Sequence, residues 1–219
     1  MRTFAIAAVL LAVALAASPR AAECGDPQKG TTAWTPLFNG KDLTGWKKPT
    51  GEAIVTVEDG MLVGTQTTGK GGDVFTEKEY DDFELRFTYK VVWPANSGVW
   101  FRGKYQFDIL KYKNPVAFSG TLYCPGKMFI TKNLKEELEN RDGWNEGQIY
   151  ANGDHLILWL NGTKVGECRD KTQAKGPVGI QVHGGEQFKN MKITIKKMEL
   201  RPLKPGEAPT EPKPAAPKQ

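Results

Sequence analysis

One strand-like segment of the chain carries a glutamine and a histidine on the same side. Gln181 and His183 lie two residues apart, so in an extended strand both side chains point to one face, while Ile180 and Val182 point to the other. Histidine titrates near neutral pH and can act as a general base, and a glutamine amide can hydrogen-bond to hydroxyl groups. The pattern fits either a polar functional surface or a structural histidine held by hydrogen bonds.

A second pair of segments shows the same trait. Gln106 and Asp108 share one face of an apolar run over residues 105–110, and Trp100 and Arg102 share a face shortly after Asn96. Planar polar side chains beside an aromatic ring are typical of sugar-binding sites. If these strands are neighbours, they form one groove, and its predicted polar residues are Arg102, Asp108, Gln106, Gln181 and His183.

Several other chemistries lack their signatures in this chain. The sequence has no G-x-S-x-G, P-loop or H-E-x-x-H motif. The formal charge of +5 includes lysines near the ends, and no basic stripe alternates with aromatic residues, so nucleic acid is not an expected partner. Of three cysteines, Cys124 and Cys168 could pair, and the spacings match no zinc site. His155 is expected at a strand edge without a functional role.

The elements that must position these residues are β-strands. Apolar residues at Phe83, Leu85, Phe87, Tyr89 and Val91 alternate with polar ones, as in a half-buried antiparallel strand. Asn-Gly at 161–162 predicts a hairpin, a phase slip near 196–197 predicts a β-bulge, and residues 134–140 predict a short helix. Further strands are expected at 54–57, 61–66, 98–101, 105–110, 128–130, 148–151 and 179–182. Many short strands indicate an all-β sandwich or barrel.

The two ends of the 219-residue chain differ from the middle. Residues 1–22 have a basic start, an uncharged apolar run and small residues, which predicts a cleaved signal peptide and an exported protein, periplasmic or extracellular. No membrane span is expected after cleavage. Residues 23–34 are interpreted as a linker, residues 35–202 as one domain, and the Pro/Lys-rich residues 203–219 as a disordered tail. The sequence does not specify an oligomeric state.

An ordered set of motifs between residues 35 and 202 resembles a known family. These motifs are LFNGKDLTGW at 37–46, YDDFEL at 80–85, NSGV at 96–99 followed by Arg102-Gly103, WN at 144–145, WLNG at 159–162, GIQVHG at 179–184 and FKNM at 188–191. In this order and spacing, the chain is similar to the 3-keto-disaccharide hydrolase domain family. The resemblance implies a concanavalin A-like jelly-roll sandwich of two antiparallel sheets.

The resemblance also implies a reaction. It is the hydrolytic or eliminative cleavage of glycosides already oxidised to a ketone at sugar carbon 3. That ketone acidifies the proton on carbon 2, so a base can remove it. His183 would be the base, Arg102 would stabilise the enolate, and Asp108 would act as acid or base, orient His183 or help to bind a divalent metal ion. Substrate-binding residues would be Gln106, Gln181, Trp100 and Asn96.

The chain departs from the family at the strand over 105–110. An amide, Gln106, precedes the acid Asp108, whereas family members commonly have the acid first. One carboxylate therefore stays on the same face but is shifted along the strand by about 7 Å. Two alternatives stay open at this point: a carbohydrate-binding module that does not cleave its ligand, and a structural envelope protein.

Overall fold

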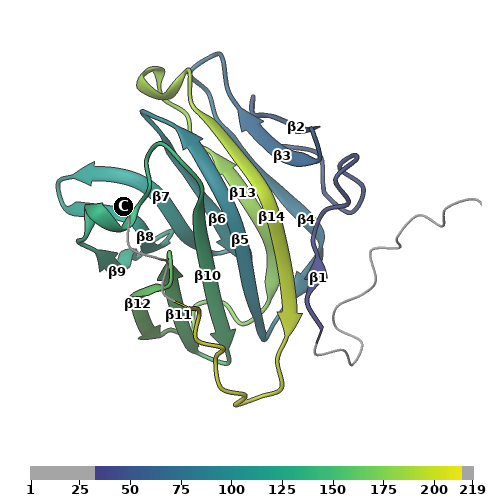
Figure 1. Cartoon of the computed structure of the whole chain (residues 1–219), viewed down its shortest axis with the longest axis vertical. Helices are drawn as coiled ribbons and strands as arrows, with labels where there is room; N and C mark the ends of the chain where they lie inside the picture. Colours follow the sequence, from purple (N-terminus) through teal and green to yellow (C-terminus); the bar gives the residue numbers. More distant parts are fainter. Residues whose placement is uncertain (1–32, 214–219) are drawn as a thin grey trace, which may run out of the picture.

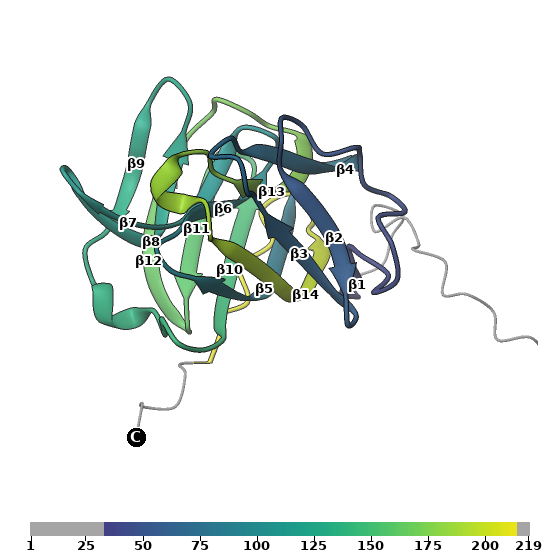
Figure 2. The ribbon, with the colours of Figure 1, turned by 90° about the horizontal axis from the view of Figure 1, so that it is seen from above.

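The computed structural model describes residues 33–213 and consists of two antiparallel sheets packed face to face (Figures 1 and 2). One sheet has the order β12-β11-β10-β5-β14-β3-β2, with β1 paired to β14, and the other has the order β4-β13-β6-β7-β8-β9. The strands of the first sheet are β1 (Thr35–Pro36), β2 (Ile54–Glu58), β3 (Met61–Thr65), β5 (Phe83–Val92), β10 (Asn145–Asn152), β11 (His155–Leu160), β12 (Thr163–Arg169) and β14 (Lys192–Pro202). Those of the second are β4 (Gly72–Tyr80), β6 (Asn96–Phe101), β7 (Tyr105–Lys113), β8 (Val116–Cys124), β9 (Met128–Asn133) and β13 (Gly176–Val182). The all-β sandwich predicted from the sequence is confirmed.

The core lies between the two sheets and is built by alternate residues of each strand. The five alternating apolar residues of β5 are all buried, as their spacing predicts. Phe87 of β5 meets Phe107 of β7 edge to face, with ring centroids 5.2 Å apart. Such contacts join the sheets, and full burial of one large apolar side chain contributes roughly 1.5–3 kcal/mol.

Two local predictions about strand geometry are confirmed. Leu160 pairs with Thr163 across the turn between β11 and β12, and Asn161 and Gly162 have φ values of 48° and 77°. Both residues tolerate this left-handed conformation, which a tight hairpin turn of this kind requires. In β14 the register shifts between Ile195 and Lys197, so the predicted bulge lies at the expected place.

Two other local predictions need correction. The expected helix over 134–140 is a single 3₁₀ turn at Glu136–Leu138, designated η1. Strands β4 and β8 were not predicted, because charged residues interrupt the alternation in the second half of β4, and β8 contains a run of small and hydroxyl residues. A second 3₁₀ turn, η2, covers Glu186–Phe188.

The segment after β14 is not a disordered tail as far as residue 213. Residues 203–213, called the strap below, run along the outer face of β10. Three outward side chains of that strand, Asn152, Tyr150 and Gln148, donate hydrogen bonds to strap carbonyl groups at 2.8, 2.7 and 2.6 Å. Their partners are the carbonyl oxygens of Lys204, Glu207 and Thr210, in that order. The composition of the segment gave no sign of this, because the groups that hold it are far away in sequence.

A buried ion pair and a small apolar cluster also hold the strap. The guanidinium of Arg201 contacts the fully buried carboxylate of Glu84 at 2.8 Å, and Glu84 also accepts the backbone N–H of Thr210. Leu203 packs against a cluster of Tyr150, Ile157 and Trp159. The expected signal peptide at 1–22, most of the linker at 23–34 and residues 214–219 lie outside the described residues.

The pairing considered for the two cysteines is not found. Cys124 and Cys168 are both unpaired, so the bridge that their spacing allowed does not form. Burial raises the pKa of the Cys168 thiol to about 11.

Between residues 33 and 213 there is no helix with the length and apolar character needed to span a bilayer.

Candidate functional site

Strand pairing brings together the polar residues that the sequence singled out. In the six-stranded sheet, Gln181 of β13 lies opposite Gly98 of β6, which lies opposite Asp108 of β7. Gln106 pairs with Trp100 one step along the same strands. The side chains at these positions point away from the core, because their neighbours Val99, Phe107 and Ile180 belong to the hydrophobic core between the sheets.

These side chains surround a pocket with a cavity volume of about 210 Å³ on the outer face of the six-stranded sheet. Five of the predicted site residues line it, namely Asn96, Gln106, Asp108, Gln181 and His183. The remaining lining residues are Leu110, Tyr112, Tyr123, Met128 and Phe129. The pocket therefore has a polar side from β6, β7 and β13 and an aromatic side from β7, β8 and β9.

Two buried polar groups in the pocket have no protein partner. The carboxyl group of Asp108 is 3% exposed and forms no hydrogen bond with any residue in the described range. The amide nitrogen of Gln106 is buried and likewise unpartnered among these residues. A buried polar group without a partner costs about 1–3 kcal/mol, so two together at a cavity indicate a place prepared for a polar ligand.

Burial also sets the protonation of Asp108. Desolvation raises its pKa well above the usual range for an aspartate, and no neighbouring cation opposes the shift. The group is therefore prone to hold a proton, and a protonated carboxyl group can donate a hydrogen bond to a ligand oxygen.

A glycine makes room for Gln106. Gly98 lies beside it in β6, and a Cβ atom at that position would come within 2.5 Å of the Gln106 amide nitrogen. The glutamine side chain therefore occupies the space above Gly98. Any larger residue there would push the amide out of place.

His183 lies at the rim of the pocket, just after β13, and is exposed. Its Nδ1 atom faces the carbonyl oxygen of Gly184. A carbonyl oxygen only accepts hydrogen bonds, so Nδ1 must carry the proton in the neutral ring, and the lone pair is then on Nε2. The edge of the Phe188 ring contacts the imidazole, with centroids 5.7 Å apart. His183 can therefore accept a proton at Nε2.

Asp73 of β4 is a neighbour of this histidine that the sequence analysis missed. Its carboxylate accepts a hydrogen bond from the indole nitrogen of Trp100 at 2.7 Å. Burial raises the pKa of Asp73, while the Trp100 hydrogen bond and the charge of His183 oppose that rise. Trp100 itself does not line the pocket. It is 7% exposed and supports Asp73 on one side and Tyr123 on the other, with ring centroids 6.3 Å apart.

Arg102 is not part of this pocket, contrary to the prediction. Strand β6 ends at Phe101, and Arg102 has φ 50°, so the alternation that placed it beside Trp100 does not extend to it. Its fully buried guanidinium donates to the carbonyl oxygens of Asp81 and Gly153, each at 2.7 Å. It also contacts the Asp82 carboxylate at 3.0 Å. Arg102 joins three loops at one end of the sandwich.

The aromatic side of the pocket was also missed. The ring of Phe129 in β9 contacts Tyr112 and Tyr123 edge to face, at centroid distances of 5.9 and 6.3 Å. One signal in the sequence could have located Tyr112, because the alternation through Gln106 and Asp108 places it on the same face of β7.

The metal ion considered from the sequence has no clear site. Residues 33–213 contain no group of three or more His, Cys, Asp or Glu side chains arranged to hold a metal ion. In the pocket, Asp108 and His183 are the two side chains of these types.

Comparisons with known proteins agree with this architecture. A family model described as the 3-keto-alpha-glucoside-1,2-lyase-like domain matches residues 33–194. A candidate glycosyl hydrolase from Parabacteroides distasonis is similar in structure, with a TM-score of 0.60, 20% identity, and coverage of 78% of this chain and 94% of that one. No curated protein matches the chain in sequence.

Two sugar-binding structures share the fold as well. A carbohydrate-binding module from Bacillus subtilis has a TM-score of 0.50 at 12% identity, over 72% of this chain and 95% of that one. The lumenal domain of VIP36, with bound calcium and mannose, has a TM-score of 0.57 at 12% identity, over 76% and 86%. At such identities the likeness shows the fold alone.

Proposed function

Because the chain belongs to the family of 3-keto-alpha-glucoside-1,2-lyase-like domains, we propose that it cleaves glycosides whose sugar carries a ketone at carbon 3. The observation that carries the proposal is the pair of buried, unpartnered groups at Asp108 and Gln106 in the same pocket as His183. A keto-sugar supplies the acceptor oxygen that these groups lack. The predicted signal peptide supports action outside the cytoplasm, in the periplasm or beyond the cell.

The first step is removal of the proton on carbon 2. His183 accepts this proton at Nε2, and the electrons of the C–H bond form an enolate with the carbon 3 oxygen. The protonated Asp108 and the Gln106 amide donate hydrogen bonds to that oxygen, the task first assigned to Arg102. Arg102 is not assigned this role, because its guanidinium lies outside the pocket and is bound to backbone carbonyl oxygens and to Asp82.

The second step is departure of the group on carbon 1. The enolate re-forms the ketone, a double bond forms between carbons 1 and 2, and the bond to the glycosidic oxygen breaks. That oxygen leaves with the proton held by His183. Addition of water across the double bond then yields the free 3-keto sugar, so the sum of the two stages is hydrolysis. Asn96 and Gln181 are placed to bind other hydroxyl groups of the ring.

The test is a mass-resolved incubation of the mature protein with 3-keto-trehalose and with trehalose, with and without a divalent metal ion. We expect release of 3-keto-glucose from the oxidised sugar only. Replacement of the base in His183→Ala should lower the rate by ~10²–10⁴-fold. Reactions in D₂O add a second measurement, since proton abstraction at carbon 2 should introduce deuterium there. Full turnover in both His183→Ala and Asp108→Asn would refute the assigned roles.

A binding module is the second candidate, and pocket size favours it. The cavity of about 210 Å³ is smaller than the ~300–1,000 Å³ of typical ligand pockets, which fits capture of a single sugar ring. Saturable binding of 3-keto-glycosides without turnover of any member of a broad panel would establish this function instead. A purely structural role is not favoured, because the pocket is open and contains unpartnered polar groups.

A further inference from the structure

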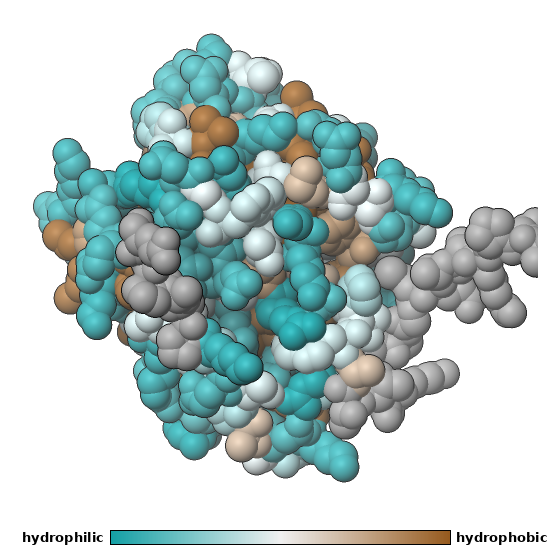
Figure 3. Space-filling model, viewed as in Figure 1, coloured by the Kyte–Doolittle hydropathy of each residue, from teal (hydrophilic) through white to brown (hydrophobic). Residues whose placement is uncertain are grey.

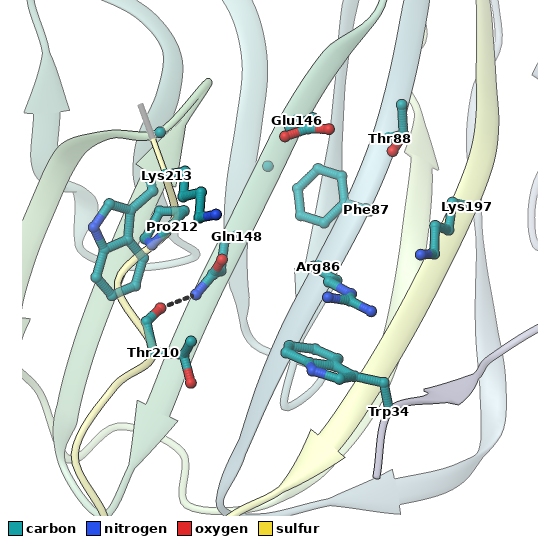
Figure 4. Close-up of a pocket in the computed structure, with 13 residues that line it drawn as sticks. Trp34, Arg86, Phe87, Thr88, Glu146, Gln148, Lys197, Thr210, Pro212 and Lys213 are labelled. Atoms are coloured by element: carbon teal, nitrogen blue, oxygen red, sulfur yellow. Dashed lines mark hydrogen bonds between the residues drawn. The ribbon is translucent and has the colours of Figure 1, made fainter. Parts of the chain in front are cut away.

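A second groove lies on the other side of the sandwich, on the outer face of the eight-stranded sheet (Figure 4). Its cavity volume is about 290 Å³. The surface seen from this side is mainly hydrophilic (Figure 3). The groove crosses β10, β5 and β14, and none of its lining residues belongs to the candidate active-site pocket.

One wall of this outer groove is a tryptophan fixed by a charged network. The guanidinium of Arg86 lies 4.1 Å from the centre of the Trp34 ring, within the range of a cation–π contact. Glu199 in turn holds Arg86 at 2.7 Å and Lys197 at 3.1 Å. The ring is therefore held in place by its neighbours and remains partly exposed.

The opposite wall is the end of the strap. Gln148 donates to the carbonyl oxygen of Thr210 at 2.6 Å, and the indole nitrogen of Trp159 donates to Glu211 at 3.1 Å. Pro212 and Lys213 continue this wall (Figure 4). Strap residues 204–210 bond to the outward side chains of β10 from Asn152 to Gln148, and the next outward side chain of the strand, Glu146, lines the groove.

Between these walls are polar side chains that are accessible to a ligand and have no side-chain partner within residues 33–213. Thr88 is half-buried and Glu146 and Lys213 are open to solvent, and their side-chain polar groups form no hydrogen bond or ion pair with another residue of 33–213. Together they offer an acceptor, a donor and a hydroxyl group that can be either. Such a mixture matches sugar hydroxyl groups, which themselves both donate and accept.

The charges of the outer groove balance. Three cationic side chains line it, Arg86, Lys197 and Lys213, and they are matched by the lining Glu146 together with Glu199 and Glu211, which bond to lining residues. A phosphate or other anion would therefore find no net positive charge. Neutral hydroxyl-rich ligands fit this balance better.

We propose that the outer groove is a second carbohydrate-binding site, for a neutral oligosaccharide, with a sugar ring against Trp34 and its hydroxyl groups on Thr88, Glu146 and Gln148. It works independently of the candidate active-site pocket. Because the two sites lie on opposite faces, the protein can hold a glycan through one face while the other stays open.

The test is calorimetric titration of the mature full-length protein with cellohexaose and maltohexaose. We expect saturable binding of at least one of them, weakened about tenfold by Trp34→Ala, the loss expected for a central aromatic anchor. Thr88→Val removes the hydroxyl group but keeps the shape of the side chain and its preference for β-strands. It should weaken binding without changing the melting temperature, so weaker binding would reflect a lost ligand contact and not misfolding. Trp144→Ala removes an exposed tryptophan outside the groove and should bind normally.

The outcomes are distinguishable from those of the catalytic test. Binding that survives Asp108→Asn but is weakened in Trp34→Ala and Thr88→Val supports the outer groove, whether or not the protein cleaves keto-sugars. The proposal is overturned if neither hexasaccharide binds, or if Asp108→Asn abolishes binding while Trp34→Ala and Thr88→Val leave it intact.

Discussion

Replacement of Asp108 by asparagine should make the protein more stable, and increasingly so as the pH rises. Asp108 is almost fully buried, has no hydrogen-bond partner within residues 33–213, and has its pKa raised by desolvation. Asparagine has nearly the same shape and size but cannot ionise. The two proteins therefore differ mainly in the free energy needed to ionise a carboxyl group inside the pocket.

The size of this effect follows from proton linkage. Below the pKa of the unfolded chain, about 3.9, Asp108 is protonated in both states and the two proteins should have similar stability. Above that pH the unfolded state loses the proton while the folded state keeps it, so folded wild-type protein binds more protons. Its free energy of unfolding then falls by about 1.4 kcal/mol for each pH unit relative to Asp108→Asn. The difference stops growing at the pKa of the folded state.

The measurement is urea unfolding of both proteins between pH 3.5 and 8 in steps of about half a unit, analysed as a two-state transition. Asp59→Asn is the matched control, since it removes an exposed carboxylate at a turn and should show only a small difference throughout. A difference that stays flat for Asp108→Asn, or a wild type that is the more stable protein at pH 7, would refute the burial argument. A variant that is stable and inactive would show that the pocket trades stability for function.

Two further predictions concern residues outside the pocket. Arg102→Ala should lower the free energy of unfolding by about 3–5 kcal/mol, because three backbone carbonyls lose their buried donor and the Asp82 carboxylate loses its cationic partner. At a temperature where the Arg102→Ala protein is folded, its turnover number should equal that of the wild type. A large loss of turnover would instead support the predicted role of Arg102 in stabilising the enolate. Glu84→Ala should cost about 3 kcal/mol and speed hydrogen exchange in residues 203–213, because the strap loses its buried anchor. The exposed pair of Glu58 and Lys192 is the control, where Glu58→Ala should cost less than about 1 kcal/mol.

The sequence predicted the site well where one strand could be followed without interruption. Alternation along β7 and along β13 with the residue that follows it placed Gln106, Asp108, Gln181 and His183 on the pocket side, because the period of two is a property of the extended backbone. The predicted groove required these strands to be neighbours, and they are, because β13 pairs with β6 and β6 pairs with β7. The register, which decides that Gln181 and Asp108 lie in one row across Gly98, is set by contacts that are remote in sequence.

Two predictions are wrong where local sequence does not decide the structure, at Arg102 and in the strap. Alternation continued from Trp100 predicts Arg102 on the same face, but β6 ends at Phe101 and the left-handed conformation of Arg102 itself ends the alternation. The strap was judged by its own composition, which is rich in proline and lysine, whereas it is held by side chains of β10 that lie more than 50 residues earlier. Local composition describes what a segment can bury by itself and says little about a surface that another part of the chain prepares for it.

The core and the candidate active-site pocket are two faces of the same strands, and this explains how the unpartnered groups are tolerated. In β7, Tyr105, Phe107 and Ile109 are fully buried, while Gln106 and Asp108 alternate with them on the pocket side. A slip of one residue would place the carboxyl group in the core and the Phe107 ring in solvent, so the hydrophobic contacts that fix the register also fix the positions of the reactive groups. Burial of the three core side chains contributes several kcal/mol, roughly 1.5–3 each, which exceeds the penalty for leaving Asp108 and Gln106 unpaired. The pocket can therefore hold its polar groups ready for a ligand without losing the fold that positions them.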